Sequence, residues 1–141
     1  MIGRDLQRFV DAQAPVYAQV LDELRRGRKT SHWMWFIFPQ LRGLGRSAMA
    51  IHYGLASGAE AHAYWCHALL GPRLRECAEL VLAVDNKTAV DILGSPDDMK
   101  LRSCMTLFDA VVPDEPLFTA LLGRFYGGER DLRTLALLEP A

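Results

Sequence analysis

Hydrophobic residues recur at helical spacing along most of the chain, and no stretch alternates with the period of two that is typical of a half-buried strand. One clear stripe follows Pro15, which suits the first turn of a helix, and Gly27 is placed to end that helix. A second stripe runs through the segment from Ser95 to about Val112. The members of the two stripes are Val16, Tyr17, Val20, Leu21 and Leu24, and Leu101, Cys104, Met105, Phe108, Val111 and Val112. The pattern predicts an all-α fold with the second helix central to the core.

Capping residues, prolines and glycines divide the rest of the chain into further short helices. Ser57 and Glu60 match a capping box, and the run Ser95-Pro96-Asp97-Asp98 has the cap, proline and acids of a helix start. Further helices are expected over residues 5–13, 47–53, 58–67, from 72 onward, and over 88–93, 117–126 and 131–138. We therefore expect a compact multi-helical single domain of about seven or eight short helices, spanning residues 1–141 with a core from about 5 to 138.

Composition narrows the protein class. A chain of 141 residues that is half hydrophobic can bury a core without disulfides or metals. The formal net charge is -1, so no overall field favours nucleic acid or an anionic membrane as a partner. The three cysteines form no C-x-x-C pair, the N-terminus lacks an apolar leader, and no stretch approaches the ~18 apolar residues of a membrane span. These features predict a cytoplasmic protein.

The most unusual segment is aromatic: residues 31–40 read Ser-His-Trp-Met-Trp-Phe-Ile-Phe-Pro-Gln. Six consecutive large apolar residues fit neither helical nor strand periodicity, so one interpretation is a short helix buried at the centre of the core. The polar ends of the segment support a second interpretation. Lys29, His32 and Gln40 lie beside an aromatic wall, and the following loop adds Arg42, Arg46 and Ser47 with two glycines. Such groups can converge on a phosphate.

A second polar group lies on the helix that begins near Pro96. At 100° per residue, Asp97 falls inside the apolar arc, Lys100 near its edge, and Ser103 and Thr106 on the flank beside Lys100. In a structural interpretation, Asp97 caps the first-turn amides while Ser103 and Thr106 bond back to helix carbonyls. In a functional interpretation, this edge is the opposite wall of the site that begins at His32, and Asp97 orients His32 or Lys100.

Other candidates have less support. His62 and Cys66 are four residues apart and His67 follows, but no second cluster completes a metal site, so we expect neither a metal nor a cofactor. The basic run of residues 25–29 is typical of a solvated helix end, and single-stranded RNA binding there is the third functional hypothesis. The chain contains no G-x-S-x-G or H-E-x-x-H motif and no closely spaced pair of catalytic carboxylates.

The aromatic string 31–40, the run Gly-Leu-Gly-Arg-Ser at 43–47 and the segment 98–108 together resemble a bacterial family of unknown function whose members often carry the name calpastatin. The similarity spans about residues 5–138. It implies an all-helical single domain without a settled activity and offers no catalytic residues to carry over. The name itself does not suit the chain, because calpastatin inhibitory segments are disordered and this composition is that of a packed globule.

A weaker similarity concerns the order of the helices and the acid-x-Lys pattern that begins at Asp98. These features are similar to a small helical family that acts on ADP-ribose and NAD-derived compounds, although the full active-site pattern of that family is not matched.

The leading hypothesis is a site that binds, and as an enzyme hydrolyses, a small anionic aromatic ligand of the nucleotide or ADP-ribose class. His32 and Asp97 are the acid-base candidates. Trp33 or Trp35 would wall the base, and the remaining ligand-binding candidates are Lys29, Gln40, Arg42, Arg46, Ser47, Lys100, Ser103 and Thr106. The alternative is a non-catalytic helical interaction module that acts as a monomer or weak homo-oligomer and uses any exposed apolar remainder for a partner.

Overall fold

The computed structural model describes residues 2–139, with side chains from residue 6 onward. In that part the chain forms α1 (Ile2–Gln13), α2 (Tyr17–Arg25), α3 (Met34–Ile37), α4 (Ala48–Tyr53), α5 (Gly58–Cys66), α6 (Leu70–Leu82), α7 (Ala89–Leu93), α8 (Asp97–Val111), α9 (Pro116–Tyr126) and α10 (Leu132–Leu138). The all-α prediction is confirmed. The described residues hold ten helices, more than the expected seven or eight, and one of them is the four-residue α3 inside the aromatic segment.

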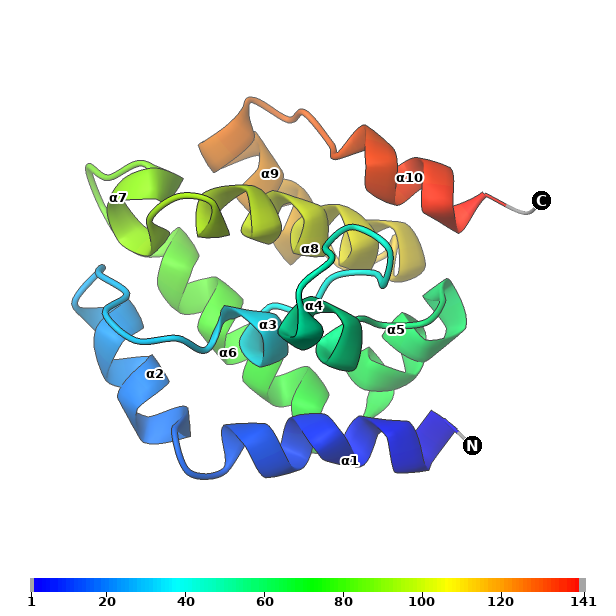
Figure 1. The fold of residues 1–141 in the computed structure, drawn as a ribbon. Helices are drawn as coiled ribbons and strands as arrows, with labels where there is room; N and C mark the ends of the chain where they lie inside the picture. The colour runs from blue at the N-terminus through cyan, green and yellow to red at the C-terminus, as the bar shows by residue number, and fades with distance from the viewer. Residues whose placement is uncertain (1, 140–141) are drawn as a thin grey trace.

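The helices surround one core. In Figure 1, α1 runs along one side of the molecule, α10 lies on the opposite side, and α3 and α8 lie between them. α8 packs against α9, α5, α7 and α10, and α6 packs against α5, α9 and α2. The central position predicted for the helix after Pro96 is therefore confirmed. No helix in residues 2–139 is long and apolar enough to cross a membrane.

Aromatic rings link these layers through the core. The Tyr64 ring on α5 meets Phe9 of α1 edge-on, with centroids 5.1 Å apart, and lies 5.7 Å from Phe108 of α8. Phe108 in turn lies 5.7 Å from Phe118 of α9. All four side chains are fully buried. Rings at these separations add favourable edge interactions to their large buried area, so they join four helices into one hydrophobic unit.

Several predicted helix caps are present. The Ser47 hydroxyl accepts a hydrogen bond from Ala50 N at 3.1 Å and caps α4. Thr88 and Asp91 form a reciprocal capping box at α7, and Asp131 accepts from Thr134 N at 3.2 Å at the start of α10. Each of these caps uses a side chain within three residues of the amide that it satisfies, so the sequence alone specifies it.

Two predicted helix starts differ from the structure. Ser57 accepts from Glu60 N, but the Glu60 carboxylate turns to Ala56 N at 2.9 Å and to Arg8 Nη2 at 3.4 Å, so only half of the capping box forms. The capping position of α8 is Pro96, which offers no side-chain acceptor, so Ser95 does not cap this helix as predicted. In both cases a contact from elsewhere in the fold, or the proline itself, overrides the local signal.

Residues 42–54 form an excursion from the core that is closed at its base. Arg42 N donates to Leu55 O at 2.8 Å and Leu55 N donates to Gln40 O at 3.0 Å, which makes an isolated parallel bridge between Leu41 and Leu55. A side chain at Gly54 would lie 2.7 Å from the Arg42 Cα atom, so the return requires glycine. The excursion carries α4, and the bridge fixes the position of Gln40 at its base.

Candidate functional site

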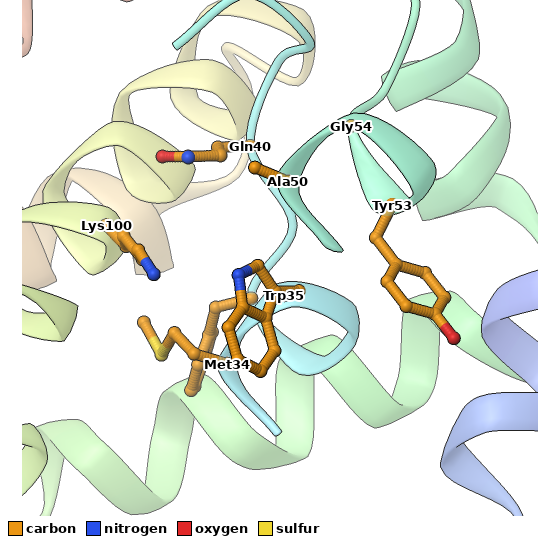
Figure 2. A pocket seen from close by; sticks show the side chains of 8 residues that line it. Met34, Trp35, Gln40, Ala50, Tyr53, Gly54 and Lys100 are labelled. Atoms are coloured by element: carbon orange, nitrogen blue, oxygen red, sulfur yellow. The ribbon is translucent and has the colours of Figure 1, made fainter. Parts of the chain in front are cut away.

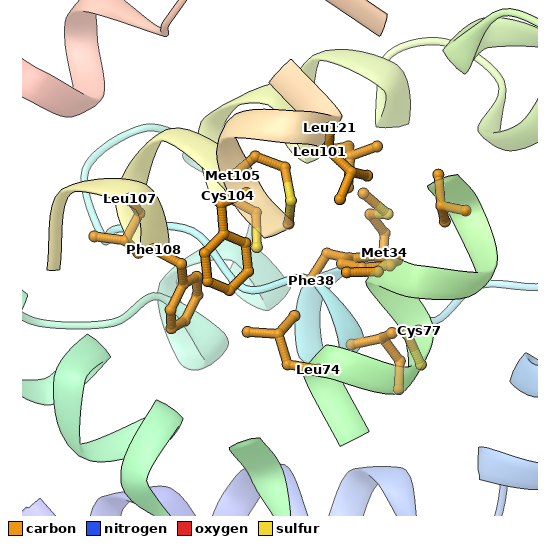
Figure 3. Packing of buried hydrophobic residues seen from close by; sticks show 14 of the residues in the cluster. Met34, Phe38, Leu74, Cys77, Leu101, Cys104, Met105, Leu107, Phe108 and Leu121 are labelled. Carbon is orange, nitrogen blue, oxygen red and sulfur yellow. The ribbon is translucent and has the colours of Figure 1, made fainter. Parts of the chain in front are cut away.

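The aromatic segment is divided between the core and one surface hollow. Trp33, Met34 and Phe38 are each 1% exposed, and Figure 3 shows Met34 and Phe38 lying among the core side chains of α6 and α8. The core interpretation of these aromatic residues is therefore confirmed. Trp35 differs from them because it is only partly buried and lines the surface. Trp33 cannot wall a ligand as we predicted, because its ring belongs to the core.

A buried carboxylate fixes the loop that leads into this segment. Glu23 of α2 is 2% exposed. Its Oε1 accepts from Thr30 N at 2.8 Å, Ser31 N at 3.1 Å and Trp33 Nε1 at 2.9 Å. Its Oε2 accepts from Ser31 Oγ at 2.6 Å and Gln19 Nε2 at 2.9 Å. Burial alone would raise the pKa of Glu23, but these hydrogen bonds stabilise the carboxylate and lower its pKa to about 2.

Sequence reasoning did not identify Glu23 as a functional or structural centre. Its signal was its position three residues after Val20 and one before Leu24, at the edge of the buried stripe of α2. A charged residue at such a position is buried only when it is paired or well hydrogen-bonded. The consequence for the site is that residues 30–33 are held rigidly by Glu23.

Three adjoining hollows form one groove between the aromatic segment and α8, which we call the Lys100 groove because Lys100 lines all three. The first hollow holds about 380 Å³ beside Lys29, His32 and Asp97. The second holds about 420 Å³ and extends toward α10. The third is a notch of about 10 Å³ beside Trp35, shown in Figure 2. The two larger hollows each reach the ~300 Å³ size that is typical of small-molecule sites.

One carboxylate and two ammonium groups lie along the first hollow. Asp97 Oδ2 is 2.9 Å from Lys29 Nζ, and Asp97 Oδ1 is 3.5 Å from Lys100 Nζ. Lys29 is nearly enclosed, with 7% of its side chain exposed, whereas Lys100 is 25% exposed. The Lys29 ammonium also lies 5.2 Å from the centroid of the Trp33 ring, and the Lys100 ammonium 5.0 Å from that of Trp35. Lys100 is therefore the cation that the first hollow presents to solvent.

The far end of the groove is built by α10. Asp131 and Arg133 line the 420 Å³ hollow together with Gln40, Met99 and Lys100. Burial would raise the pKa of Asp131, but hydrogen bonds from Thr134 and Ser103 lower it below the usual value. Counting Lys29, Lys100 and Arg133 against Asp97 and Asp131, the charged lining carries three cations and two anions. The lining therefore has a net positive charge of one.

The structure brings together seven of the predicted site residues. Lys29, His32, Trp35, Gln40, Lys100 and Asp97 all line the Lys100 groove, although they come from two segments about 60 residues apart. Ser103 also lines it, with its hydroxyl 3.2 Å from Met99 O and 3.0 Å from Asp131 Oδ2. The back-bonding predicted for Ser103 is confirmed, and so is that of Thr106, whose hydroxyl donates to Arg102 O at 2.8 Å.

Four other predicted ligand contacts are not in the groove. Thr106 is fully buried. Arg42 lines a separate hollow with His52 and donates to Gly54 O at 3.2 Å. Arg46 is exposed away from the three hollows, and Ser47 is occupied as the cap of α4. The loop residues were expected to converge on an anion together with the ends of the aromatic segment, but Arg42 lines a hollow that shares no lining residue with the groove.

The predicted pairing of Asp97 with His32 is also wrong. Both carboxylate oxygens of Asp97 face lysines, and the exposed His32 ring has no hydrogen-bond partner among residues 2–139. The pairing of Asp97 with Lys100 is confirmed. Asp97 thus neutralises cations instead of orienting an acid-base group.

In the 420 Å³ hollow, sequence reasoning missed the apolar residues Leu44, Pro96 and Met99 and the charged residues Asp131 and Arg133. Met99 could have been noticed in the sequence, because it is a large apolar residue next to Lys100 on the outer side of α8. In the structure it is 47% exposed. Arg133 could not have been noticed in the same way, because its place depends on how α10 packs on α8. In the described part of the chain, no group of three His, Cys, Asp or Glu side chains is arranged to hold a metal ion.

Comparison with known proteins places the chain in a family. The profile of a family described as "Protein of unknown function (DUF1810)" matches residues 3–138. The conserved hypothetical protein Rv1873 from Mycobacterium tuberculosis, whose crystal structure is solved, has 56% sequence identity. The alignment covers 97% of this chain and 98% of that chain, with a TM-score of 0.95. No curated protein matches the chain. The matches confirm the resemblance to a family of unknown function.

Proposed function

The chain belongs to the DUF1810 family, and we propose that it binds a small anionic ligand with an aromatic ring, of the nucleotide or ADP-ribose class, in the Lys100 groove. The observation that carries the proposal is that one partly exposed lysine lines three adjoining hollows whose charged residues sum to a positive charge. Such a surface attracts anions, although the whole chain has a net charge of -1.

Lys100 is the group best suited to hold a phosphate. Its ammonium has three donors, and the one acceptor near it, Asp97 Oδ1, lies at the long distance of 3.5 Å. Asp97 is bound more closely by Lys29, at 2.9 Å. A phosphate oxygen can therefore replace Asp97 as the acceptor for the Lys100 ammonium, while Lys29 still neutralises the Asp97 carboxylate. Arg133 at the far end supplies a second cation for an extended ligand.

The apolar part of the groove suits an aromatic ring. Leu44, Pro96 and Met99 lie together in the 420 Å³ hollow, next to Lys100. Our earlier expectation placed the base against Trp35, but the Lys100 ammonium lies over the ring of Trp35 at 5.0 Å. A base stacked on that face would have to displace the cation from a favourable contact. We therefore assign the base to the surface made by Leu44, Pro96 and Met99.

Hydrolysis of the ligand remains a prediction that rests on His32. This histidine lines the 380 Å³ hollow beside Lys29 and is exposed, so it can approach a bond of a ligand held by Lys100. If the chain is an enzyme of this kind, His32→Ala retains ligand binding and loses product formation from ADP-ribose, followed by chromatography.

Calorimetric titration of the protein with ADP-ribose, NAD and AMP tests the proposal. We expect binding of at least one of them, weakened about tenfold by Lys100→Met, because a charge-assisted hydrogen bond is lost while the aliphatic stem is retained. Lys87→Met is the matched control, since Lys87 lines a different hollow beside α2 and α6 and its loss should leave the affinity unchanged. Absence of binding by the wild type at millimolar ligand would contradict the proposal.

The alternative function, a helical interaction module, draws on one specific observation. Large hydrophobic side chains are exposed on two helices outside the groove: Ile51 on α4 is 52% exposed, and Leu132 and Leu137 on α10 are 75% and 50% exposed. Such side chains are common at protein interfaces. This module predicts that Leu132→Ser alters the sedimentation of the protein or its capture of a partner, while Lys100→Met changes neither.

A further inference from the structure

Two tryptophans two residues apart differ in one hydrogen bond. The Trp33 indole N–H donates to Glu23 Oε1 at 2.9 Å. The Trp35 indole N–H is also screened from solvent, yet it has no acceptor within residues 2–139. A buried polar group without a partner destabilises the folded protein, and native proteins contain few of them. An unpaired donor that persists beside a groove therefore points to an acceptor that comes from outside the chain.

The surroundings of this N–H are rich in donors. The notch at Trp35 has a volume of about 10 Å³, which is about the space taken by one water-sized atom. In Figure 2 the nitrogen-bearing edge of Trp35 faces the space between the side chains of Gln40 and Lys100. The side-chain amide of Gln40 makes no hydrogen bond to any described residue, and the Lys100 ammonium, besides its contact with the Trp35 ring, has only the long contact to Asp97. Indole, amide and ammonium thus offer N–H groups around one small space.

The remaining walls of the notch restrict what can enter it. Met34, Phe38 and Tyr53 line it with apolar surface, and Lys100 stands at its opening. A group that donates hydrogen bonds would face the indole N–H and the ammonium without an acceptor from either. An oxygen that carries negative charge is stabilised by both, and the apolar walls strengthen the interaction by excluding water.

From this arrangement we propose that the notch is an oxyanion subsite, in which one oxygen of a phosphate or carboxylate group accepts hydrogen bonds from Trp35 Nε1, the Gln40 amide and Lys100 Nζ. This inference deepens the proposed function and rests on it, since it names the part of the ligand that the notch receives. It also assigns Trp35 a specific role: the edge of the indole contacts the ligand through its N–H, while its face stays covered by Lys100.

Phosphate and acetate titrations followed by NMR test the subsite without requiring a nucleotide. The chain has three tryptophans, so its indole N–H groups give three signals in a ¹H–¹⁵N spectrum, and Trp35→Phe identifies the one from Trp35. At constant ionic strength, we expect this signal to shift downfield and saturate with sodium phosphate, with sodium acetate, or with both, while the Trp33 signal stays in place. The anion that saturates at the lower concentration identifies phosphate or carboxylate as the natural group. A Trp35 signal that neither anion moves would overturn the inference.

The affinity of variants for AMP and adenosine provides the second test. Trp35→Phe retains an aromatic ring and removes the donor, so we expect about tenfold weaker binding of AMP and unchanged binding of adenosine. Trp65→Phe is the matched control, because Trp65 lies on α5 beside Arg75 and outside the groove. Equal losses for AMP and adenosine would show that Trp35 stacks on the base, and would overturn the inference.

These results separate the inference from the proposed function. If the wild type binds neither AMP nor ADP-ribose but its Trp35 signal saturates with phosphate, the function fails and the subsite stands. If nucleotides bind and the Trp35 signal is unmoved by both anions, the function stands and the subsite fails. A thermal unfolding curve of Trp35→Phe that matches the wild type shows that a change of affinity is not a loss of fold.

Discussion

Two carboxylates lie beside the aromatic segment, and they differ in their burial and in the groups that surround them. Glu23 is 2% exposed and accepts five hydrogen bonds from Gln19, Thr30, Ser31 and Trp33, none of them from a charged group. Asp97 has 18% of its side chain exposed and faces the ammonium groups of Lys29 and Lys100. The Glu23 network is closed, because both carboxylate oxygens already accept hydrogen bonds from the chain. The Asp97 network is open to solvent on the side of the groove.

The difference separates a structural site from the proposed binding site. A buried network with all its partners in place fixes one conformation and leaves nothing for a ligand. In the Asp97 network, the Lys100 ammonium has one long contact to Asp97, and the unpaired Trp35 N–H lies nearby. This region therefore has more hydrogen-bond donors than acceptors. We infer that the hydrogen bonds to Glu23 make residues 30–33 rigid, and that this rigidity holds the neighbouring Trp35 in a fixed position.

Removal of the closed network should have the largest effect. Glu23→Ala leaves the buried N–H group of Trp33 and the partly buried N–H groups of Thr30 and Ser31 without an acceptor, and we expect the free energy of unfolding to fall by about 4 kcal/mol. Urea denaturation followed by circular dichroism measures the loss. Glu79→Ala, at an exposed position of α6, is the control and should change stability by less than about 0.5 kcal/mol. A similar small change for Glu23→Ala would show that the network is not structural.

The same carboxylate should make stability depend on pH. The pKa of Glu23 is about 2 in the folded protein, below its usual value of 4.5, so folding favours the charged form. Its contribution is fully present above pH 4.5 and is lost as the pH falls toward 2. We expect the stability difference between the wild type and Glu23→Gln to narrow by about 3 kcal/mol across this range. Because other acids titrate equally in both proteins, a difference that is constant with pH would refute this role.

Disruption of the open network should have a smaller effect on stability and a larger one on binding. Asp97→Asn removes the charge that Lys29 and Lys100 share, and we expect a loss of about 1 kcal/mol in the free energy of unfolding because the pair is partly solvated. Nucleotide affinity should increase, since Lys100 no longer has a competing anion. Calorimetry on this variant and on Asp85→Asn, an exposed control, measures both changes. Weaker binding by Asp97→Asn would mean that Asp97 contacts the ligand directly.

The parts of the fold that follow from the sequence are those fixed by neighbours in the chain. Ser47 and Asp131 cap the helices that they were expected to cap. The stripe on α8 is buried from Leu101 to Phe108, as its spacing predicts, while Val111 and Val112 are only partly buried. The site was predictable to the same extent. Lys29 and His32 lie in one short loop, and Asp97 and Lys100 lie one turn apart on α8, so each pair could be identified as a unit.

The remaining features depend on packing between distant segments. Arg42 follows the aromatic segment by only a few residues, yet the bridge between Leu41 and Leu55 directs it away from the groove. Arg133 is far away in sequence and lines the groove because α10 packs on α8. Spacing along a chain does not encode such positions. Glu23 is a further example, because its carboxylate accepts hydrogen bonds from residues 30–33 only after these residues fold back onto α2.

The bridge between Leu41 and Leu55 also bears on how such a protein can change over evolutionary time. It joins the two ends of residues 42–54, and α4 within this excursion has no buried residue. Apart from Tyr53, which packs against Phe9 and Phe36, and Gly54, which must be glycine, substitutions within this excursion leave the buried core intact. They can alter Leu44 and Gly45, which border the groove. Preference for the proposed ligand and stability of the fold therefore depend largely on different residues, so selection can modify the first without losing the second.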